Sequence, residues 1–188
     1  MTELRGARVV LRGFRPEEID LVMRRIAGGS FTVTTPETDA RRRGRLERSG
    51  ARNDWEFLFA IEAGGRLVGD CQARCSDQAM PPGVWEVGLE LWDEAERGRG
   101  MGREATGLLT SYLFEREAAI RVQATTDVDN APMCRILETL GFGFEGTLRG
   151  FMPSADGPPR DYTMYGMTRQ DWETKGAHGP GSTATPRC

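Results

Sequence analysis

The feature that most constrains this chain is a glycine-rich turn, Arg97 to Gly102, between a strand-like run and a helix-like run. Before it, in Val84–Trp92, apolar and polar residues alternate at the two-residue period of a strand. After it, apolar residues from Ala105 to Leu113 recur at the spacing of one helical face. Alternate glycines let main-chain N–H groups converge at a helix start, where the helix dipole favours an anion. The turn is therefore predicted to hold a phosphate, with the guanidinium groups of Arg97, Arg99 and Arg103 adding charge.

This turn differs from the two common nucleotide-binding loops. Gly98, Gly100 and Gly102 do not give G-x-G-x-x-G, and no G-K-[ST] is present. By themselves these glycines are equally compatible with a simple strand-to-helix turn. However, Arg97-x-x-Gly100-x-Gly102 matches the R/Q-x-x-G-x-G/A pattern, and the turn thus resembles the pyrophosphate loop of the GCN5-related N-acetyltransferases.

The resemblance extends along roughly residues 6 to 172. The blocks that carry it are Glu86–Leu91, Gly98–Ala105, Asn130 and Ile136–Gly146, which look like the ribosomal-protein-alanine acetyltransferase branch. The resemblance implies an α/β (α+β) fold with a mixed, mostly antiparallel central sheet of about seven strands, splayed at its centre and flanked by helices.

Periodicity and turn residues predict an order of elements that agrees with this fold. Antiparallel strands come first, and helices and strands then alternate before a closing pair of strands. The predicted elements are a strand over Ala7–Leu11, a helix over 15–26, a hairpin of Trp55–Ile61 and Arg66–Cys75, the strand at 84–92, a helix from the turn to about Glu117, a strand over Ile120–Thr125, a helix from Asn130 to Leu140 ended by Gly141, and strands over Gly143–Phe151 and Tyr162–Thr168.

Length and composition indicate one globular domain. At 188 residues the chain can bury a core, so residues 1–173 are predicted to form the acyltransferase domain and residues 174–188, rich in glycine and small polar residues, a disordered tail. The net charge of −3 gives no overall basic field for nucleic acid. No signal peptide and no apolar run of about eighteen residues is found, so we expect a cytoplasmic protein without a membrane partner. A homodimer remains open.

Residues 28–53 show poor periodicity and carry a cluster of arginines. In the family this region walls the acceptor pocket. The cluster either covers a solvated helix or binds an anionic partner such as RNA, in which case the affinity should fall with salt. Only Lys175 among the 25 basic residues is a lysine, so codon composition explains the arginine bias more easily. The arginines are Arg41, Arg42, Arg43, Arg45, Arg48 and Arg52.

The resemblance also implies acetyl-CoA as co-substrate, with no metal. The pantetheine would lie in the splayed gap against main-chain groups of Leu91 and Trp92. Asn130 matches the family asparagine that hydrogen-bonds the pantetheine, and it is equally an N-cap. The pyrophosphate would be held by Arg97, Gly98, Arg99, Gly100, Met101, Gly102 and Arg103. Cys71, Cys75, Cys134 and Cys188 lack zinc spacing.

Attack on a thioester needs a neutral amine, so we looked for a general base. The sole histidine, His178, lies in the predicted tail. Glu86 and Glu90 share one strand face with Gly88 between them, and two close acids would raise one pKa toward neutrality. They are the predicted catalytic residues. The alternative is that each pairs with an arginine and orders the sheet.

The chain departs from the family at its candidate acids. Leu137 stands where many members have a tyrosine that protonates the leaving thiolate, and Met133 stands where the branch often has serine. Cys134 is either a covalent carrier or, more simply, a helix-packing thiol. Tyr112, Tyr162 and Tyr165 are unassigned, with Tyr165 expected in the core.

The prediction is an acyl-CoA-dependent N-acyltransferase that moves acetyl from acetyl-CoA to a primary amine by direct attack in a ternary complex. A small-molecule acceptor is preferred. The alternatives are a protein N-terminal acetyltransferase, a transferase using another acyl-CoA or an aminoacyl-tRNA, and a non-catalytic acyl-CoA-binding protein.

Overall fold

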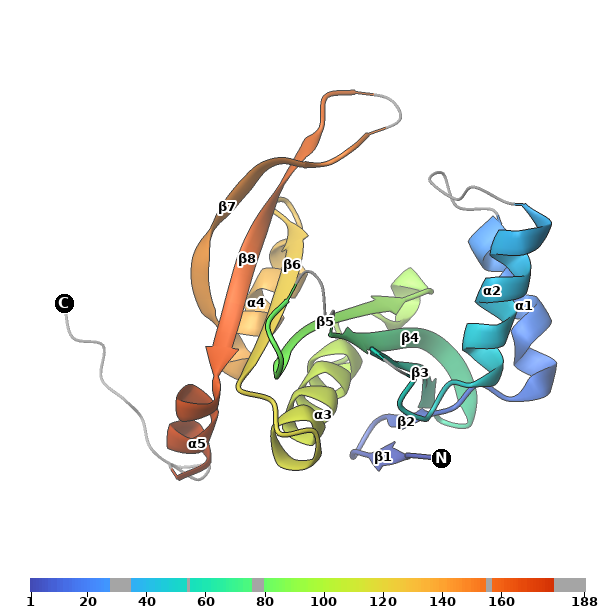
Figure 1. Ribbon diagram of the computed structural model, residues 1–188, viewed down its shortest axis with the longest axis horizontal. Coiled ribbons are helices and arrows are strands. Elements are labelled where there is room, and N and C mark those ends of the chain that lie inside the picture. The colour runs from blue at the N-terminus through green and yellow to red at the C-terminus, as the bar shows by residue number, and fades with distance from the viewer. Residues whose placement is uncertain (28–34, 54, 76–79, 155–156, 178–188) are drawn as a thin grey trace.

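The computed structural model describes residues 1–27, 35–53, 55–75, 80–154 and 157–177 and has one mixed sheet with helices against it (Figure 1). Within these residues the strand order is β1-β2-β3-β4-β5-β6-β8-β7, and only β5 and β6 pair in parallel. The predicted fold class is therefore confirmed. The elements are β1 Leu4–Arg5, β2 Val10–Arg12, α1 Pro16–Ala27, α2 Pro36–Glu47, β3 Glu56–Ala63, β4 Arg66–Arg74, β5 Val84–Leu91, the short helix η1 Glu94–Glu96, α3 Met101–Arg116, β6 Arg121–Asp127, α4 Ala131–Leu140, β7 Gly143–Met152, β8 Arg160–Thr168 and α5 Arg169–Ala177.

The two ends of the chain differ most from the predicted elements. The first strand was predicted from Ala7, but β2 begins only at Val10. The reason is that the Gly6 N–H donates to the Val9 carbonyl at 2.9 Å and closes a turn after β1. At the other end α5 runs through 174–177, which the sequence analysis assigned to the tail. Its start is a capping box, since the N–H groups of Thr168 and Asp171 each bond the other residue's side chain, at 2.9 and 3.2 Å. His178 and the rest of the predicted tail lie outside the described residues.

The sheet opens between β5 and β6. These two strands pair only at Val84, Trp85 and Glu86, although β5 continues to Leu91 and β6 to Asp127. Figure 1 shows the strands diverging beyond this seam, with α1 and α2 toward one end of the sheet and the β7–β8 hairpin at the other. The splayed centre that the resemblance implied is thus present, and it forms where a parallel pair of strands separates.

One face of the sheet carries the main core. In α3, Ala105, Leu109 and Leu113 are at most 1% exposed, which confirms the predicted apolar face of that helix. They pack in one cluster with Trp85 and Val87, so the odd-numbered side chains of β5 point toward α3. By the two-residue period of a strand, Glu86, Gly88 and Glu90 point to the opposite face.

Helices α1 and α2 cover that opposite face beside β3 and β4. Phe14, Ile19, Val22, Leu46 and Ala60 form a second, smaller core cluster there. Periodicity did not locate α2, because Leu46 is its only buried residue, and the only indication of a helix here was the solvated-helix interpretation of the arginine cluster. Its start is nevertheless encoded locally by Pro36 and by a reciprocal cap in which the Thr38 N–H donates to Thr35 Oγ1 at 3.2 Å.

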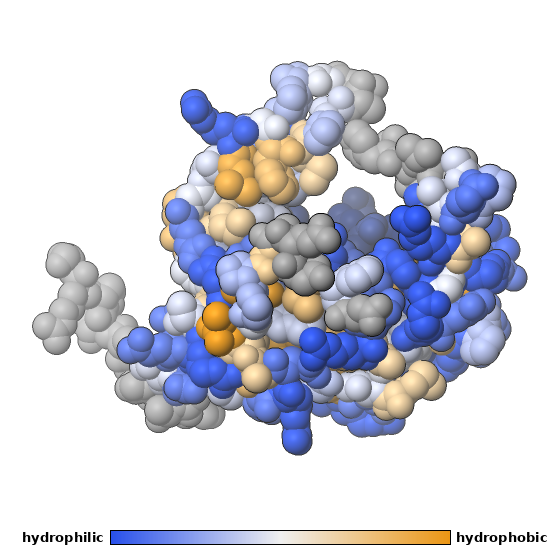
Figure 2. All heavy atoms as spheres, in the orientation of Figure 1, coloured by the Kyte–Doolittle hydropathy of each residue, from blue (hydrophilic) through white to orange (hydrophobic). Residues whose placement is uncertain are grey.

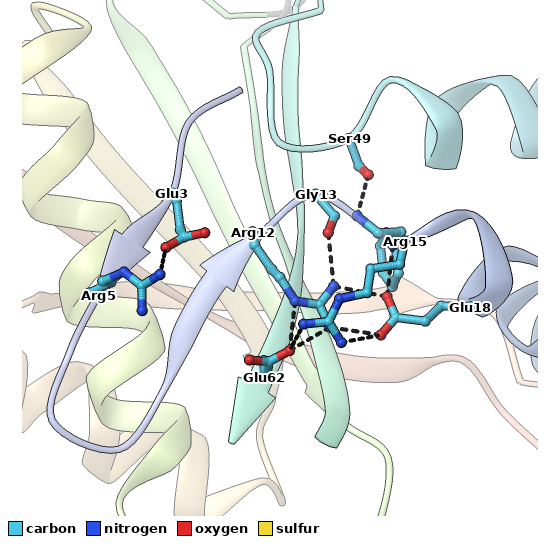
Figure 3. Close-up of polar contacts among 9 residues, drawn as sticks. Glu3, Arg5, Arg12, Gly13, Arg15, Glu18, Ser49 and Glu62 are labelled. Carbon is cyan, nitrogen blue, oxygen red and sulfur yellow. Dashed lines mark hydrogen bonds and ion pairs between the residues drawn. The ribbon is translucent and has the colours of Figure 1, made fainter. Parts of the chain in front are cut away.

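An ion-pair network fastens the start of α1 to the sheet (Figure 3). Arg12 of β2, 8% exposed, donates to Glu18 of α1 at 2.7 and 2.8 Å and to Glu62 of β3 at 2.8 Å. Arg15 also bonds Glu62, at 2.6 Å. The hydrogen bond to Glu18 raises the pKa of Arg12. Arg15 also pairs with Glu18, so each glutamate has two arginine partners, and Arg12 is the buried one of the two.

The chain returns from α2 to the sheet at Ser49. Its hydroxyl donates to the Leu46 carbonyl at 2.5 Å and accepts the Phe14 N–H at 2.7 Å, which ties the end of α2 to the segment before α1 (Figure 3). These bonds connect the two helices on the face of the sheet that β3 and β4 form.

Candidate active site

The glycine turn adopts the geometry that its sequence predicts. Gly98 and Gly100 have φ values of +75° and +81°, in the left-handed region that favours glycine. Gly100 is the N-cap of α3, and it supplies no side-chain hydrogen bond to the first turn. The first N–H groups of α3 therefore point outward without a side-chain cap, as an anion-binding helix start requires.

A pocket of about 940 Å³, here called the loop pocket, lies between this turn, the end of β5 and α4. Its described lining includes five arginines and a single carboxylate, Glu90, so its charge suits an anionic ligand. Arg103 and Arg135 form no ion pair within the described residues, whereas Arg99 pairs with Glu96 at 3.2 Å. The lining is Arg8, Leu89, Glu90, Leu91, Arg97, Gly98, Arg99, Gly100, Gly102, Arg103, Asn130, Pro132, Met133, Arg135, Ile136 and Thr139.

Most of the predicted donor-site residues are brought together in the loop pocket, but two are not. Met101 is 5% exposed and packs into the core instead. Trp92 lines a different pocket, and its main-chain N–H donates to the Val68 carbonyl at 3.0 Å. Sequence reasoning also missed Arg8 and Arg135, because neither is near the turn in the chain.

The main-chain groups that face the splayed gap belong to alternate residues of β5. Since Trp92 bonds across to β4, the alternation of an antiparallel pair turns the N–H and C=O groups of Leu91 and Leu89 toward the β6 side. The Leu91 carbonyl is within reach of the Arg97 guanidinium at 3.4 Å. Of the two predicted main-chain contributors, Leu91 therefore faces the gap and the Trp92 N–H does not.

A second pocket, of about 460 Å³ and here called the helix pocket, lies between α1, α2 and strands β3 to β5. Its floor is the face of the sheet that carries Glu90, and Glu90 lines both pockets. The two pockets therefore meet at the end of β5. The lining is Phe14, Val22, Arg25, Ile26, Arg45, Leu46, Leu58, Asp70, Gln72, Glu90 and Trp92.

Glu86 and Glu90 share one face of β5, as predicted, but their surroundings differ. Glu86 pairs with Arg74 at 2.8 Å and lines neither pocket. Glu90 pairs with Arg25 of α1 at 2.8 Å, and the Arg25 guanidinium also lies over the Trp92 ring, 5.3 Å from its centroid. Both glutamates are thus paired with an arginine, as expected if they help to order the sheet. Only Glu90 also borders the pockets.

Asp70 is the carboxylate that sequence reasoning did not identify. It lies on β4 directly opposite Glu90, and its Oδ2 accepts a hydrogen bond from Trp92 Nε1 at 2.8 Å. Burial raises the pKa of Asp70, and the hydrogen bond from Trp92 opposes that shift. The available signal was an acidic residue that follows the apolar run Leu67–Gly69 within a predicted strand.

Asn130 caps α4 as predicted. Its Oδ1 accepts the Met133 N–H at 3.3 Å, and its Nδ2 donates to Thr126 Oγ1 at 3.1 Å. The helix ends at Gly141, whose φ of +87° is left-handed. Asn130 also lines the loop pocket, so capping and a ligand contact are compatible in position.

The other groups considered for acid or covalent chemistry lie in packed positions. Leu137 is fully buried, and Tyr165, 4% exposed, donates its hydroxyl to Glu138 at 3.0 Å. Burial raises the pKa of Tyr165. Cys134 lies 3.9 Å from Thr163 Oγ1 on the sheet side of α4. Within the described chain no group of three or more histidine, cysteine or acidic side chains is placed to hold a metal ion.

Three of the six arginines in residues 41–52 pair with acidic residues of other elements. Arg43 pairs with Asp20 of α1 at 2.5 Å, Arg45 with Glu56 of β3 at 2.7 Å, and Arg52 with Glu117 at 2.7 Å. Figure 2 shows largely hydrophilic residues over α1 and α2 and apolar ones gathered on the β7–β8 hairpin. No helix in the described part of the chain is long and apolar enough to cross a membrane.

Known proteins resemble this chain in sequence and in fold. Residues 8–143 match the family model described as an acetyltransferase (GNAT) domain. The SPbeta prophage-derived uncharacterized N-acetyltransferase YokL of Bacillus subtilis is 27% identical over 171 residues, which cover 89% of this chain and 94% of that protein. The uncharacterized N-acetyltransferase p20 of Bacillus licheniformis is 25% identical over 182 residues, or 92% and 99% of the two chains.

Solved structures of the same fold include two ribosomal-protein acetyltransferases. The ribosomal-protein-S5-alanine acetyltransferase from Vibrio fischeri superposes with a TM-score of 0.73 at 18% identity and covers 92% of this chain and 99% of that one. RimL, a ribosomal L7/L12 α-N-protein acetyltransferase in complex with coenzyme A, gives 0.70 at 15% identity, with 88% and 97% covered. At these identities the likeness shows the fold alone.

Proposed function

This chain belongs to the GNAT acetyltransferase family, and from that premise we propose that it transfers an acetyl group from acetyl-CoA to a primary amine of a small molecule. The transfer is a direct attack in a ternary complex. The observation that carries the proposal is the meeting of the two pockets at Glu90, since a donor in one and an amine in the other would touch at the end of β5.

The donor side of the proposal is supported by the chemistry of the loop pocket. An uncapped helix start and five arginines offer N–H donors and positive charge to a pyrophosphate. Gly102 is tightly placed, since a Cβ there would lie 3.3 Å from Ile136 Cδ1. The main chain at Leu91 faces the gap, where it is positioned to bond the pantetheine and to stabilise charge on the acetyl oxygen.

The acceptor side is supported by the helix pocket. Its volume of about 460 Å³ lies in the usual range for small-molecule sites, and α1 and α2 wall it on one side. Of the two predicted catalytic glutamates, we assign Glu90 the place beside the reacting amine, because Glu86 borders neither pocket. Glu86 supports the same strand face through Arg74.

A second candidate acceptor is a protein N-terminal amine, favoured by the fold shared with the two ribosomal-protein acetyltransferases. The two candidates differ in what fills the helix pocket. Release of free thiol from acetyl-CoA with small primary amines, but not with peptides that begin with alanine, would support the small-molecule proposal. The reverse preference would establish the protein N-terminal alternative.

The test of the donor site is calorimetric titration of the purified protein with acetyl-CoA and CoA. Gly100→Glu places a negative side chain at the start of α3 and should weaken binding by about tenfold or more, the scale of a charged hydrogen bond. Gly64→Glu is the matched control, because Gly64 also has a left-handed φ, +56°, and has open space around it in the β3–β4 turn. Equal binding by both variants and the wild type would refute the loop-pocket assignment.

A further inference from the structure

We propose that Asp70 holds the ammonium group of the acceptor in the helix pocket and accepts its proton, so that the pocket selects small primary amines with an apolar body and no carboxylate. This inference rests on the proposed function and names the acceptor class of the same site. It starts from the charge balance of the pocket.

Four charged side chains line the helix pocket, and three of them are already paired. Arg25 bonds Glu90 at 2.8 Å. Arg45 bonds both carboxylate oxygens of Glu56, each at 2.7 Å. Asp70 alone among the four has no ion pair within the described residues. Asp70 is therefore the one carboxylate of the pocket lining without an arginine in contact, although Arg25 and Arg45 act on it from a distance, and an ammonium could make that contact.

The carboxylate of Asp70 is held with one oxygen left for a ligand. Trp92 Nε1 donates to Oδ2 at 2.8 Å, which leaves Oδ1 for another partner. Oδ1 accepts no hydrogen bond from any described residue, although a carboxylate oxygen ordinarily does so. Oδ1 is not one of the buried polar atoms without a partner, so it is open to the pocket and accessible to an ammonium.

Asp70 is also close to the place where the donor is expected. It pairs directly with Glu90 across β4 and β5, and such partners have Cα atoms about 5.5 Å apart. Glu90 is followed by Leu91, whose main chain faces the splayed gap. An amine held by Asp70 therefore lies at the border that the two pockets share.

The other lining residues of the helix pocket indicate the chemical class of the acceptor. Phe14, Val22, Ile26, Leu46 and Leu58 provide apolar lining, which suits a hydrocarbon or aromatic body. Both arginines of the pocket are engaged, so a carboxylate next to the amine would meet Asp70 and Glu90 without a free cation. Amino acids are thereby disfavoured relative to simple amines.

The transfer balances with Asp70 as proton acceptor. The acceptor ammonium gives one proton to the Asp70 carboxylate and becomes a neutral amine. The nitrogen lone pair forms the C–N bond to the acetyl carbon as the C–S bond breaks, and the electron pair leaves on sulfur. The second nitrogen proton goes to the thiolate, which yields free CoA and the amide, and Asp70 returns its proton to water.

The surroundings of Asp70 suit this role. Burial raises its pKa, and the charge of Glu90 on β5 acts in the same direction. The Trp92 hydrogen bond, Arg25 of α1 and Arg45 of α2 act against it. The transfer rate should therefore fall as the pH drops through this raised pKa, and that acid limb should vanish when the carboxylate is removed.

Binding can be tested without turnover, on protein saturated with CoA. The probes are pentylamine, 1-pentanol and norleucine, which is pentylamine with a carboxylate on the amine-bearing carbon. Calorimetry should show pentylamine binding, with 1-pentanol and norleucine weaker by about tenfold or more. Equal binding of all three, or binding of none, would overturn the inference.

The decisive variant is Asp70→Asn, which keeps an oxygen for Trp92 Nε1. It should lose pentylamine binding by about tenfold or more and lower turnover by about 100-fold, without weakening CoA binding or lowering the melting temperature. Asp70→Glu, which restores the charge, should recover part of both.

Asp20→Asn is the matched control. Asp20 lies on the same wall, but it is exposed and paired with Arg43, whose hydrogen bond lowers the pKa of Asp20. It should bind and turn over as wild type. Turnover with an unchanged acid limb in Asp70→Asn would refute the inference and leave the proposed function standing. Asp70-dependent binding of pentylamine without acetylation would support the ammonium site and count against the proposed function.

Discussion

The loop pocket and the helix pocket share Glu90 but are constructed in different ways. The loop pocket is formed mainly by a continuous stretch of chain and by main-chain groups, with arginines around it. The helix pocket is formed by side chains from elements far apart in sequence, and ion pairs fix its walls. Recognition by main chain follows from the local sequence, whereas recognition by side chains depends on the assembled fold.

The largest expected effect is a loss of stability when the ion-pair network that fastens α1 to the sheet is broken. Arg12→Ala removes the buried arginine of the network and leaves Glu18 and Glu62 with only the half-exposed Arg15, so it should lower the free energy of unfolding by about 2 kcal/mol. Urea unfolding measures this. Arg5→Ala is the control, since Arg5 pairs only with Glu3 at the surface and should cost less than about 1 kcal/mol. Equal losses in the two variants would show that the network does not hold the wall.

The next effect concerns the charge of the loop pocket. Arg103→Ala should weaken acetyl-CoA binding by about tenfold, since charged hydrogen bonds contribute a few kcal/mol at most, and should leave pentylamine binding unchanged. Arg116→Ala, at the other end of α3, is the matched control. Donor binding should also weaken as salt is added. A salt-independent donor affinity would contradict the assignment of these arginines.

A smaller effect separates the two roles of Asn130. Asn130→Ala removes the cap of α4 and should cost about 1 kcal/mol of stability. Asn130→Asp keeps an oxygen for the Met133 N–H, and its second oxygen can accept from the Thr126 hydroxyl in place of the lost Nδ2 bond, so its melting temperature should stay near wild type. If calorimetry shows weaker CoA binding by both variants, Asn130 also contacts the donor, whereas weakening by Asn130→Asp alone would report only the added negative charge in the loop pocket. Unchanged binding would leave it as a cap.

The smallest effect is a gain in stability. The pKa of an aspartate in an unfolded chain is about 3.9. Burial raises the pKa of Asp70 above that value in the folded protein. The folded state thus binds the proton more tightly, and the wild-type chain loses stability as the pH rises from about 4 through the raised pKa. Asp70→Asn should therefore unfold at slightly higher urea at pH 7, with the gain vanishing below about pH 4. A loss at pH 7 would contradict the sign.

The same contrast explains what the sequence could predict. The turn, α3 and α4 carry strong local signals, including the left-handed glycines and the Asn130 cap, and all were found. Helix α2 has one buried residue and a threonine N-cap, so its apolar residues show too little periodicity to locate it. Helix α5 begins with a capping box at Thr168 and Asp171 that reasoning by composition overlooked.

The candidate site divides in the same way. Arg97 to Gly102 could be assigned because the turn is continuous in the chain. Asp70 could not, because its significance comes from Trp92, Arg25 and Glu90, which no spacing brings together. The resemblance to the family favoured Glu86 over Glu90, whereas the position of the pockets favours Glu90.

The short seam between β5 and β6 has a consequence for solubility. Beyond Glu86 each strand has an unpaired side, so the middle of the sheet contains two exposed strand edges. Such edges are templates for adding another strand, which in most proteins invites aggregation. A ligand lying in the gap would cap both edges, so protein stored with CoA should resist aggregation on mild heating better than protein stored alone.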